Sequence, residues 1–214
     1  MINIYYCNIT NFKNLTGYDL LTPERQIKLN QYKQFSDQVR CLVAGLLLRY
    51  ALGDNLAASI TKDSNGKPQL ADSSIHFNLS HSGNYVILGV SDHIIGVDIE
   101  MNAPYSSSVA RKCFTIKEQA WLLSNTNSNI QPFSDAFFKL WTGKESIMKA
   151  IGLGFRLAPE SFQVLPITNS FHKILDNAWY MQWTAIDTHT VCVVTSHEEE
   201  LTLIELTREI LLCQ

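Results

Sequence analysis

The chain has 214 residues, of which 46% are hydrophobic and 17% charged, a balance that allows a substantial core and excludes a disordered protein. Its formal net charge of -3 gives no support to nucleic-acid binding. Five scattered cysteines without a CxxC pair argue against a zinc site or a disulfide framework and favour a reducing compartment.

The sequence gives no sign of export or membrane insertion. The N-terminal residues lack the basic and then apolar order of a signal peptide. The longest apolar stretch, residues 42–52, contains Gly45 and Arg49 and is too short to span a bilayer. We therefore expect a soluble cytoplasmic protein with neither nucleic-acid nor membrane partners.

The first half of the chain predicts a strand, then helix, then strands. Residues 2–9 are mostly β-branched and aromatic, which is typical of a strand. Thr22 followed by Pro23 predicts a helix start, and the helical pattern continues to residue 52. Residues 63–68 form a loop rich in turn residues, and residues 75–100 predict a β-meander.

The second half repeats this order. Thr115 and Glu118 have the spacing of a capping box at a helix start, and a strong helix is expected at 135–151 after a polar loop at 125–132. Strands are expected at 162–165, 179–186 and 190–195, followed by an apolar run at 201–206. We expect two α/β halves of the α+β (α/β) class, residues 1–102 and 103–214.

Two acids end one of the expected strands. Asp98 and Glu100 are separated by one residue, so their side chains share a face of the strand, with Cα atoms about 6.5–7 Å apart. Carboxylates so placed raise each other's pKa unless a positive charge lies between them, and a hard divalent cation would suit that position. The spacing alone is also explained by two acids that point into water.

A polar stripe marks the expected helix at 135–151. Glu145 and Lys149 are four residues apart and face the same way on an otherwise apolar helix, with Lys144 adjacent. An ordinary surface ion pair explains this spacing equally well.

Polar side chains also cluster where a strand meets a turn, at Ser80 and His81. Side-chain donors and backbone N–H groups at such a turn can bind an anion. A hydrolase is the alternative for a serine beside a histidine, but no Gly-x-Ser-x-Gly elbow is present.

Taken in order, these segments resemble the Sfp-type 4′-phosphopantetheinyl transferases. The resemblance covers residues 22–162. It rests on five spaced motifs: Gly66-Lys67-Pro68, Phe77-Asn78-Leu79-Ser80-His81-Ser82, Ile95-Gly96-Val97-Asp98-Ile99-Glu100, Phe114-Thr115-Ile116-Lys117-Glu118 and Trp141-Thr142-Gly143-Lys144-Glu145-Ser146-Ile147-Met148-Lys149. It implies two similar α/β halves packed as a pseudo-dimer within one monomeric chain.

The resemblance also implies a reaction and a set of site residues. The enzyme would transfer the phosphopantetheine arm of coenzyme A to a serine of an apo acyl or peptidyl carrier protein and release adenosine 3′,5′-bisphosphate. Mg²⁺, or Mn²⁺, would be held by Asp98, Glu100 and Glu145. Lys149 would hold the pyrophosphate, helped by Lys144, and Glu118 would be the base, with Glu145 as its rival. The matching coenzyme A residues are Arg25, Lys28, Arg40, Lys67, Ser80 and His81.

A basic and aromatic patch near Glu118 is the expected docking surface for the carrier protein, made of Arg111, Lys112, Phe114, Lys117 and Trp121. Three rival functions remain open at this level. They are a non-catalytic module that binds coenzyme A or a nucleotide, a protein that only binds carriers, and a metal-dependent phosphohydrolase.

Overall fold

The computed structural model describes residues 1–71, 74–125 and 135–213. These residues form two compact units, which are described separately below. Unit 1 contains residues 1–92 and 200–214, and unit 2 contains residues 93–199. The expected mixture of helix and sheet is confirmed, and the internal pseudo-dimer stays a prediction.

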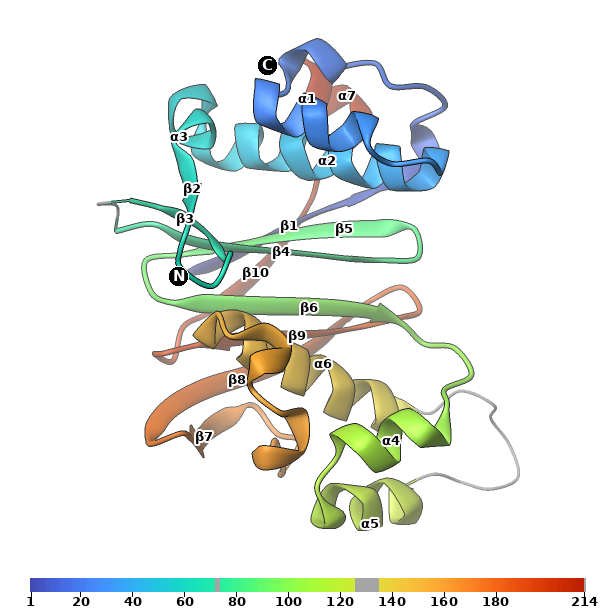
Figure 1. The fold of residues 1–214 in the computed structure, drawn as a ribbon, viewed down its shortest axis with the longest axis vertical. Coiled ribbons are helices and arrows are strands. Elements are labelled where there is room, and N and C mark those ends of the chain that lie inside the picture. Colours follow the sequence, from blue (N-terminus) through green and yellow to red (C-terminus); the bar gives the residue numbers. More distant parts are fainter. Residues whose placement is uncertain (72–73, 126–134, 214) are drawn as a thin grey trace. The chain divides into compact units, whose positions relative to one another are not determined.

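Unit 1 is a four-stranded sheet with helices packed on it (Figure 1). The sheet order is β10-β1-β5-β4, and β2 pairs with β3 in a separate hairpin. Its elements are β1 (Ile2–Asn8), α1 (Pro23–Asn30), α2 (Phe35–Leu52), α3 (Asp54–Ala58), β2 (Ile60–Lys62), β3 (Pro68–Leu70), β4 (His76–Ser82), β5 (Tyr85–Ser91), β10 (Leu201–Glu205) and α7 (Arg208–Leu212). The core lies between α2 and the sheet, where Leu42 and Leu47 are fully buried.

Unit 2 is an antiparallel four-stranded sheet in the order β6-β9-β8-β7, with α6 packed against β6 and β9 (Figure 1). Its elements are β6 (Ile95–Met101), α4 (Ser107–Cys113), α5 (Ile116–Asn125), α6 (Asp135–Ile151), β7 (Ser170–Ile174), β8 (Asn177–Ile186) and β9 (His189–Thr195). Short 3-10 turns occupy Ile9–Asn11 and Tyr18–Leu20 in unit 1, and Gly154–Arg156 and Pro159–Ser161 in unit 2.

Several local predictions are confirmed. The Thr22 side chain accepts a hydrogen bond from the backbone N–H of Arg25, with Pro23 in the first turn of α1. The Thr115 hydroxyl accepts from the N–H of Glu118, and Glu118 accepts from the N–H of Thr115, which completes the capping box. The sequence therefore specified these two helix starts through short-range hydrogen bonds.

Other predictions need correction. The helix expected up to residue 52 is interrupted at residues 31–34, where α1 ends and folds back onto α2. Residues 162–165 are irregular, and the strand lies at Ser170–Ile174 instead. Most of the polar loop expected at 125–132 falls outside the described residues.

The division of the chain also differs from the boundary expected at residue 102. The β-meander breaks after β5, because β6 pairs with β9 in unit 2. In turn, β10 pairs in parallel with β1, from Ile2 opposite Leu201 to Tyr6 opposite Glu205, which returns the end of the chain to unit 1. Both differences come from strand pairing between segments far apart in sequence.

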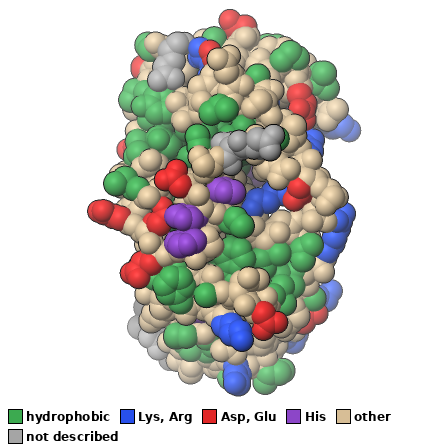
Figure 2. Space-filling view, turned by 90° about the vertical axis from the view of Figure 1, so that its left-hand side faces the viewer, with side chains coloured by type: hydrophobic (Ala, Val, Ile, Leu, Met, Phe, Trp, Pro, Cys, Tyr) green, Lys and Arg blue, Asp and Glu red, His purple; other side chains and the backbone are tan. Residues whose placement is uncertain are grey.

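The first and last residues of unit 2 contact each other. His93 Nδ1 lies 2.9 Å from Glu199 Oε1, and the His93 ring lies against that of His197, with centroids 3.8 Å apart and planes tilted by 31°. The space-filling view in Figure 2 shows histidines lying beside acidic side chains on one face. These contacts tie the two ends of unit 2 together.

No helix in the described part of the chain has the length and hydrophobicity to cross a membrane.

Gly96 allows a close contact between the backbones of β6 and α6. A Cβ atom built there would lie 2.1 Å from the backbone oxygen of Ser146 and 2.5 Å from the nitrogen of Ala150. Both are backbone atoms of a helix, so neither can move without shifting α6. Glycine at this position therefore sets the distance between the strand and the helix.

We predict that Gly96→Val destabilises the protein by about 3 kcal/mol or more, because α6 must move off the sheet. Gly143→Ala is the matched control. Its added Cβ would meet side-chain atoms at 3.1–3.4 Å, and alanine gains roughly 1 kcal/mol in helix propensity. Thermal unfolding of both variants is the measurement, and equal melting temperatures would contradict the prediction.

Candidate active site

Strand β6 presents alternate residues to helix α6. Asp98 and Glu100 lie on the face that Gly96 opens to the helix, while Ile95, Val97 and Ile99 are fully buried on the other. Two residues of strand advance about 6.6 Å and four residues of helix about 6 Å, so the two periods stay in step. Side chains at i and i+2 on the strand therefore meet side chains at i and i+4 on the helix.

The structure brings the expected acids and Lys149 together. Lys149 Nζ lies 2.6 Å from Asp98 Oδ1, and Asp98 is only 3% exposed. The indole N–H of Trp141 donates to Glu100 Oε1 at 3.3 Å. Trp141 was part of the sequence motif without a role, and the structure shows that it orients the Glu100 carboxylate.

Glu145 completes this group. Its pKa is raised from 4.5 to about 7, first by burial and then by the Asp98 and Glu100 carboxylates, while Lys149 acts in the opposite direction. An acid that resists ionisation beside two other acids marks a place where more positive charge would be stabilising.

The donor chemistry of this group suits a hard divalent cation. No three His, Cys, Asp or Glu side chains come close enough to hold a metal ion within residues 1–71, 74–125 and 135–213. However, Asp98, Glu100 and Glu145 supply carboxylate oxygens, the ligands that Mg²⁺ prefers, and the pKa of Glu145 is raised by burial and then by the other two carboxylates. These residues therefore fit the metal implied by the resemblance, and the assignment stays a proposal.

Two expected site residues are instead locked into a buried ion pair. Lys144 Nζ lies 2.8 Å from Glu118 Oε2, and both side chains have 0% exposure. Lys144 also donates to the carbonyl oxygens of Pro159 and Phe162 at 2.8 and 2.7 Å. The assignments of Lys144 to coenzyme A and of Glu118 as base are corrected, because neither side chain is accessible to a substrate.

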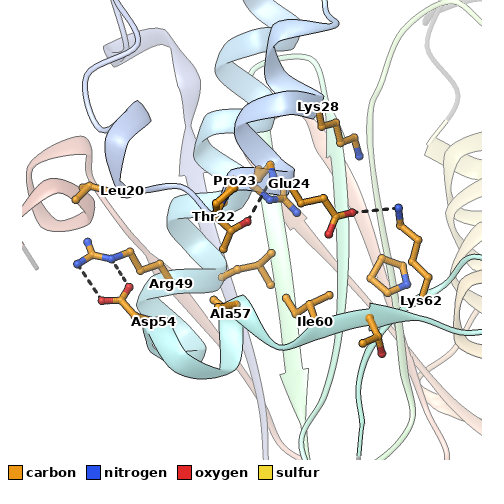
Figure 3. A pocket seen from close by; sticks show the side chains of 16 residues that line it. Leu20, Thr22, Pro23, Glu24, Lys28, Arg49, Asp54, Ala57, Ile60 and Lys62 are labelled. Atoms are coloured by element: carbon orange, nitrogen blue, oxygen red, sulfur yellow. Dashed lines mark hydrogen bonds and ion pairs between the residues drawn. The ribbon is translucent and has the colours of Figure 1, made fainter.

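In unit 1, Arg25 and Lys28 line a pocket of about 510 Å³ (Figure 3). Its walls come from α1, α2, α3 and the β2–β3 hairpin. Arg49 and Lys62 add two more cations, and Lys62 Nζ lies 3.3 Å from Glu24 Oε1. The sequence interpretation missed Lys62, although it lies on the strand that leads into the Gly66-Lys67-Pro68 loop.

The other expected coenzyme A residues lie outside the lining of this pocket. Arg40 donates to the Gly83 carbonyl in the β4–β5 turn at 2.8 Å and to Asp37 at 2.7 Å. Ser80 is buried and His81 exposed on β4, as alternation along a strand requires. Lys67 is half-buried, and burial lowers its pKa to about 8.

Comparison with known proteins assigns the chain to a family. Residues 94–200 match the family model described as the 4′-phosphopantetheinyl transferase superfamily. Residues 11–93 match the model described as 4′-phosphopantetheinyl transferase, N-terminal. The chain belongs to the 4′-phosphopantetheinyl transferase superfamily. The boundary between the two matches falls one residue after the end of the first stretch of unit 1.

Named relatives agree with this assignment and confirm the expectation of a transferase family. The chain is 35% identical over 176 residues to 4′-phosphopantetheinyl transferase gsp of Aneurinibacillus migulanus, covering 77% of this chain and 71% of that protein. It is 32% identical over 150 residues to 4′-phosphopantetheinyl transferase Sfp of Bacillus subtilis (strain 168), covering 67% and 66%. It is also 32% identical over 173 residues to the L-aminoadipate-semialdehyde dehydrogenase-phosphopantetheinyl transferase of Xenopus laevis, covering 71% and 57%.

We predict that Glu145→Gln stabilises the metal-free protein above pH 7. The raised pKa means that ionising Glu145 opposes folding as the pH rises from about 4.5 to about 7, and glutamine removes this cost. At pH 8 the gain should be on the order of 2 kcal/mol, and at pH 4 it should vanish. The same variant should lose the rise in melting temperature that Mg²⁺ gives the wild type.

Thermal unfolding at both pH values, with and without Mg²⁺, measures these effects. Glu205→Gln, which removes an exposed carboxylate on β10, is the control. If the variant is less stable than the wild type at pH 8, the prediction is wrong. That result would show that positive charge in the metal-free protein already compensates the Glu145 carboxylate.

Proposed function

We propose that the protein transfers the 4′-phosphopantetheine arm of coenzyme A to a serine of an apo acyl or peptidyl carrier protein. The group formed by Asp98, Glu100, Glu145 and Lys149 on β6 and α6 supports this most directly. It combines three acids suited to Mg²⁺ with a cation suited to a pyrophosphate, in a chain of the matching family. The cytoplasmic location and the monomeric state are part of the same proposal.

The reaction forms a bond between the carrier's serine oxygen and the β-phosphorus of coenzyme A. The bond from that phosphorus to the bridging oxygen breaks, and adenosine 3′,5′-bisphosphate leaves with the electron pair. When bound, Mg²⁺ would neutralise the pyrophosphate oxygens. Lys149 supplies a second positive charge next to Asp98. This charge would stabilise the negative charge that develops on the leaving group.

The serine proton needs an acceptor, and Glu118 is unsuited because it is fully buried against Lys144. Glu145 is the better candidate, because it lies beside Asp98 and Lys149, where the pyrophosphate is proposed to bind. It would accept the proton directly or through water. Glu145 was already the alternative to Glu118 for this role in the sequence analysis.

The pocket of unit 1 is our candidate for the phosphorylated ribose of coenzyme A. Arg25, Lys28 and Lys62 bring three cations to its walls, and the pocket has room for a nucleotide-sized group. The roles of Arg40, Lys67, Ser80 and His81 in coenzyme A binding stay predictions.

The helices α4 and α5 offer a surface for the carrier protein. Arg111, Lys112 and Lys117 are exposed there, and so are Ile116 (81%) and Leu123 (79%), which the sequence interpretation did not include. A carrier helix with acidic and apolar side chains would complement this mixture of charge and apolar area. Phe114 is only 1% exposed, so its place in the expected docking patch is corrected to the core of unit 2.

Intact mass of the carrier protein tests the reaction. We expect apo carrier incubated with coenzyme A, Mg²⁺ and the wild-type protein to gain the mass of one phosphopantetheine arm. The gain should disappear with Glu145→Ala and with EDTA. Absence of any gain across fatty-acid, polyketide and peptide carriers, with coenzyme A still bound, would favour a non-catalytic binding module.

The same assay tests the pocket. Lys62→Met should raise the KM for coenzyme A several-fold and leave the KM for carrier unchanged, because it removes a charge from the pocket wall only. Lys173→Met, which removes a lysine with a 77% exposed side chain in unit 2, is the control. Equal KM values for the two variants would place the nucleotide end elsewhere.

The docking surface predicts the opposite pattern. Arg111→Glu combined with Lys112→Glu should raise the KM for carrier about tenfold or more and leave coenzyme A affinity unchanged, since like charges would then repel an acidic carrier. Steady-state kinetics at low salt measures this, with Lys173→Glu as the control. An unchanged KM for carrier would show that the carrier docks at another surface.

A further inference from the structure

The buried pair of Glu118 and Lys144 is connected to three parts of unit 2. Glu118 lies on α5, Lys144 on α6, and both reach residues 159–164. Glu118 Oε1 accepts from the N–H of Val164 and Oε2 from the N–H of Thr115, each at 2.8 Å. The pair therefore joins α5, α6 and residues 159–164 through ionic and backbone hydrogen bonds.

Every donor on the Lys144 ammonium is used. Its three protons go to Glu118 and to the carbonyl oxygens of Pro159 and Phe162, and the ammonium lies 4.6 Å from the centre of the Phe162 ring. Burial lowers the pKa of Lys144, and the Glu118 carboxylate opposes that shift. A charge held this completely has one stable orientation, because any rotation would leave it buried and unpaired.

This orientation controls where the neighbouring residue points. Successive residues on an α-helix are about 100° apart around its axis. With Lys144 fixed toward α5 and residues 159–164, Glu145 must face a different side, where it meets Asp98 and Glu100. On the β6 side, Gly96 holds the helix against the strand, so the distance and the rotation of α6 are set by separate contacts.

We infer that Glu118 and Lys144 are positioning residues that fix the rotation of α6 and so aim Glu145 and Lys149 at Asp98. Neither side chain touches coenzyme A, metal or carrier. The inference rests on the proposed function for its kinetic consequences, whereas its effect on the group around Asp98 can be measured without turnover.

Three variants test this inference. Glu118→Gln and Lys144→Met each leave an uncompensated buried partner and should lower the melting temperature on the order of 10 °C. The double variant has no uncompensated buried charge and should recover part of that loss. Asp176→Asn, which removes a 97% exposed carboxylate of unit 2, should behave as the wild type.

The readouts are taken on folded protein well below each melting temperature. We expect the double variant to need at least fivefold more Mg²⁺ for half of the thermal shift, and to lose at least tenfold in kcat with KM for coenzyme A within twofold. The rate of the Glu118→Gln variant should still rise with pH as in the wild type, forming the ascending limb of the pH–rate profile, because Glu145 and not Glu118 is the proposed base. We expect these changes because, without the buried pair, α6 would rotate and Glu145 and Lys149 would no longer point toward Asp98.

Each alternative gives a different result. Loss of the ascending limb in Glu118→Gln would make Glu118 the base and overturn the inference. A wild-type Mg²⁺ response and kcat in the double variant would show that the pair acts on stability alone, which also overturns it. If the wild-type protein transfers no arm, the proposed function fails, and the Mg²⁺-dependent thermal shift still decides whether the pair positions the group.

Discussion

The close contact between Gly96 and α6 is the constraint on which the site depends. A strand and a helix can exchange side chains in register only if their backbones approach closely, and at Gly96 any Cβ would collide with the Ser146 carbonyl. Once the two are in contact, strand residues two apart and helix residues four apart advance by nearly the same distance. Asp98 and Glu100 therefore meet the α6 residues Glu145, Lys149 and Trp141 without any special loop.

Holding these acids together opposes folding. Burial raises the pKa of Glu145, and the carboxylates of Asp98 and Glu100 raise it further, so a third negative charge at this place is unfavourable. Lys149 relieves part of this repulsion through its ion pair with Asp98, although it is also the cation proposed for the substrate. Sites often retain such unfavourable charge because the ligand supplies what the protein lacks. The rigid packing of α6 prevents the acids from separating to relieve it.

The sequence predicted this group through two local spacings and a family resemblance together. Spacings of two on a strand and four on a helix fix which side chains share a face, and the resemblance to the 4′-phosphopantetheinyl transferases then singled out these residues as a site. Pairings between distant segments had no such signal: β10 returns to β1, and β6 leaves its expected neighbours for β9. Burial was equally hidden for Phe114, which was assigned to the docking patch as an aromatic residue close to Glu118.

Glu118 and Lys144 show why motif membership does not determine a role. Glu118 forms the capping box that its spacing from Thr115 predicted, and the same carboxylate is the counter-ion of Lys144. Lys144 and Glu145 are adjacent in one motif, yet a turn of about 100° sends one into the core and the other toward Asp98. One residue of a motif can thus orient the next, and only burial distinguishes the two.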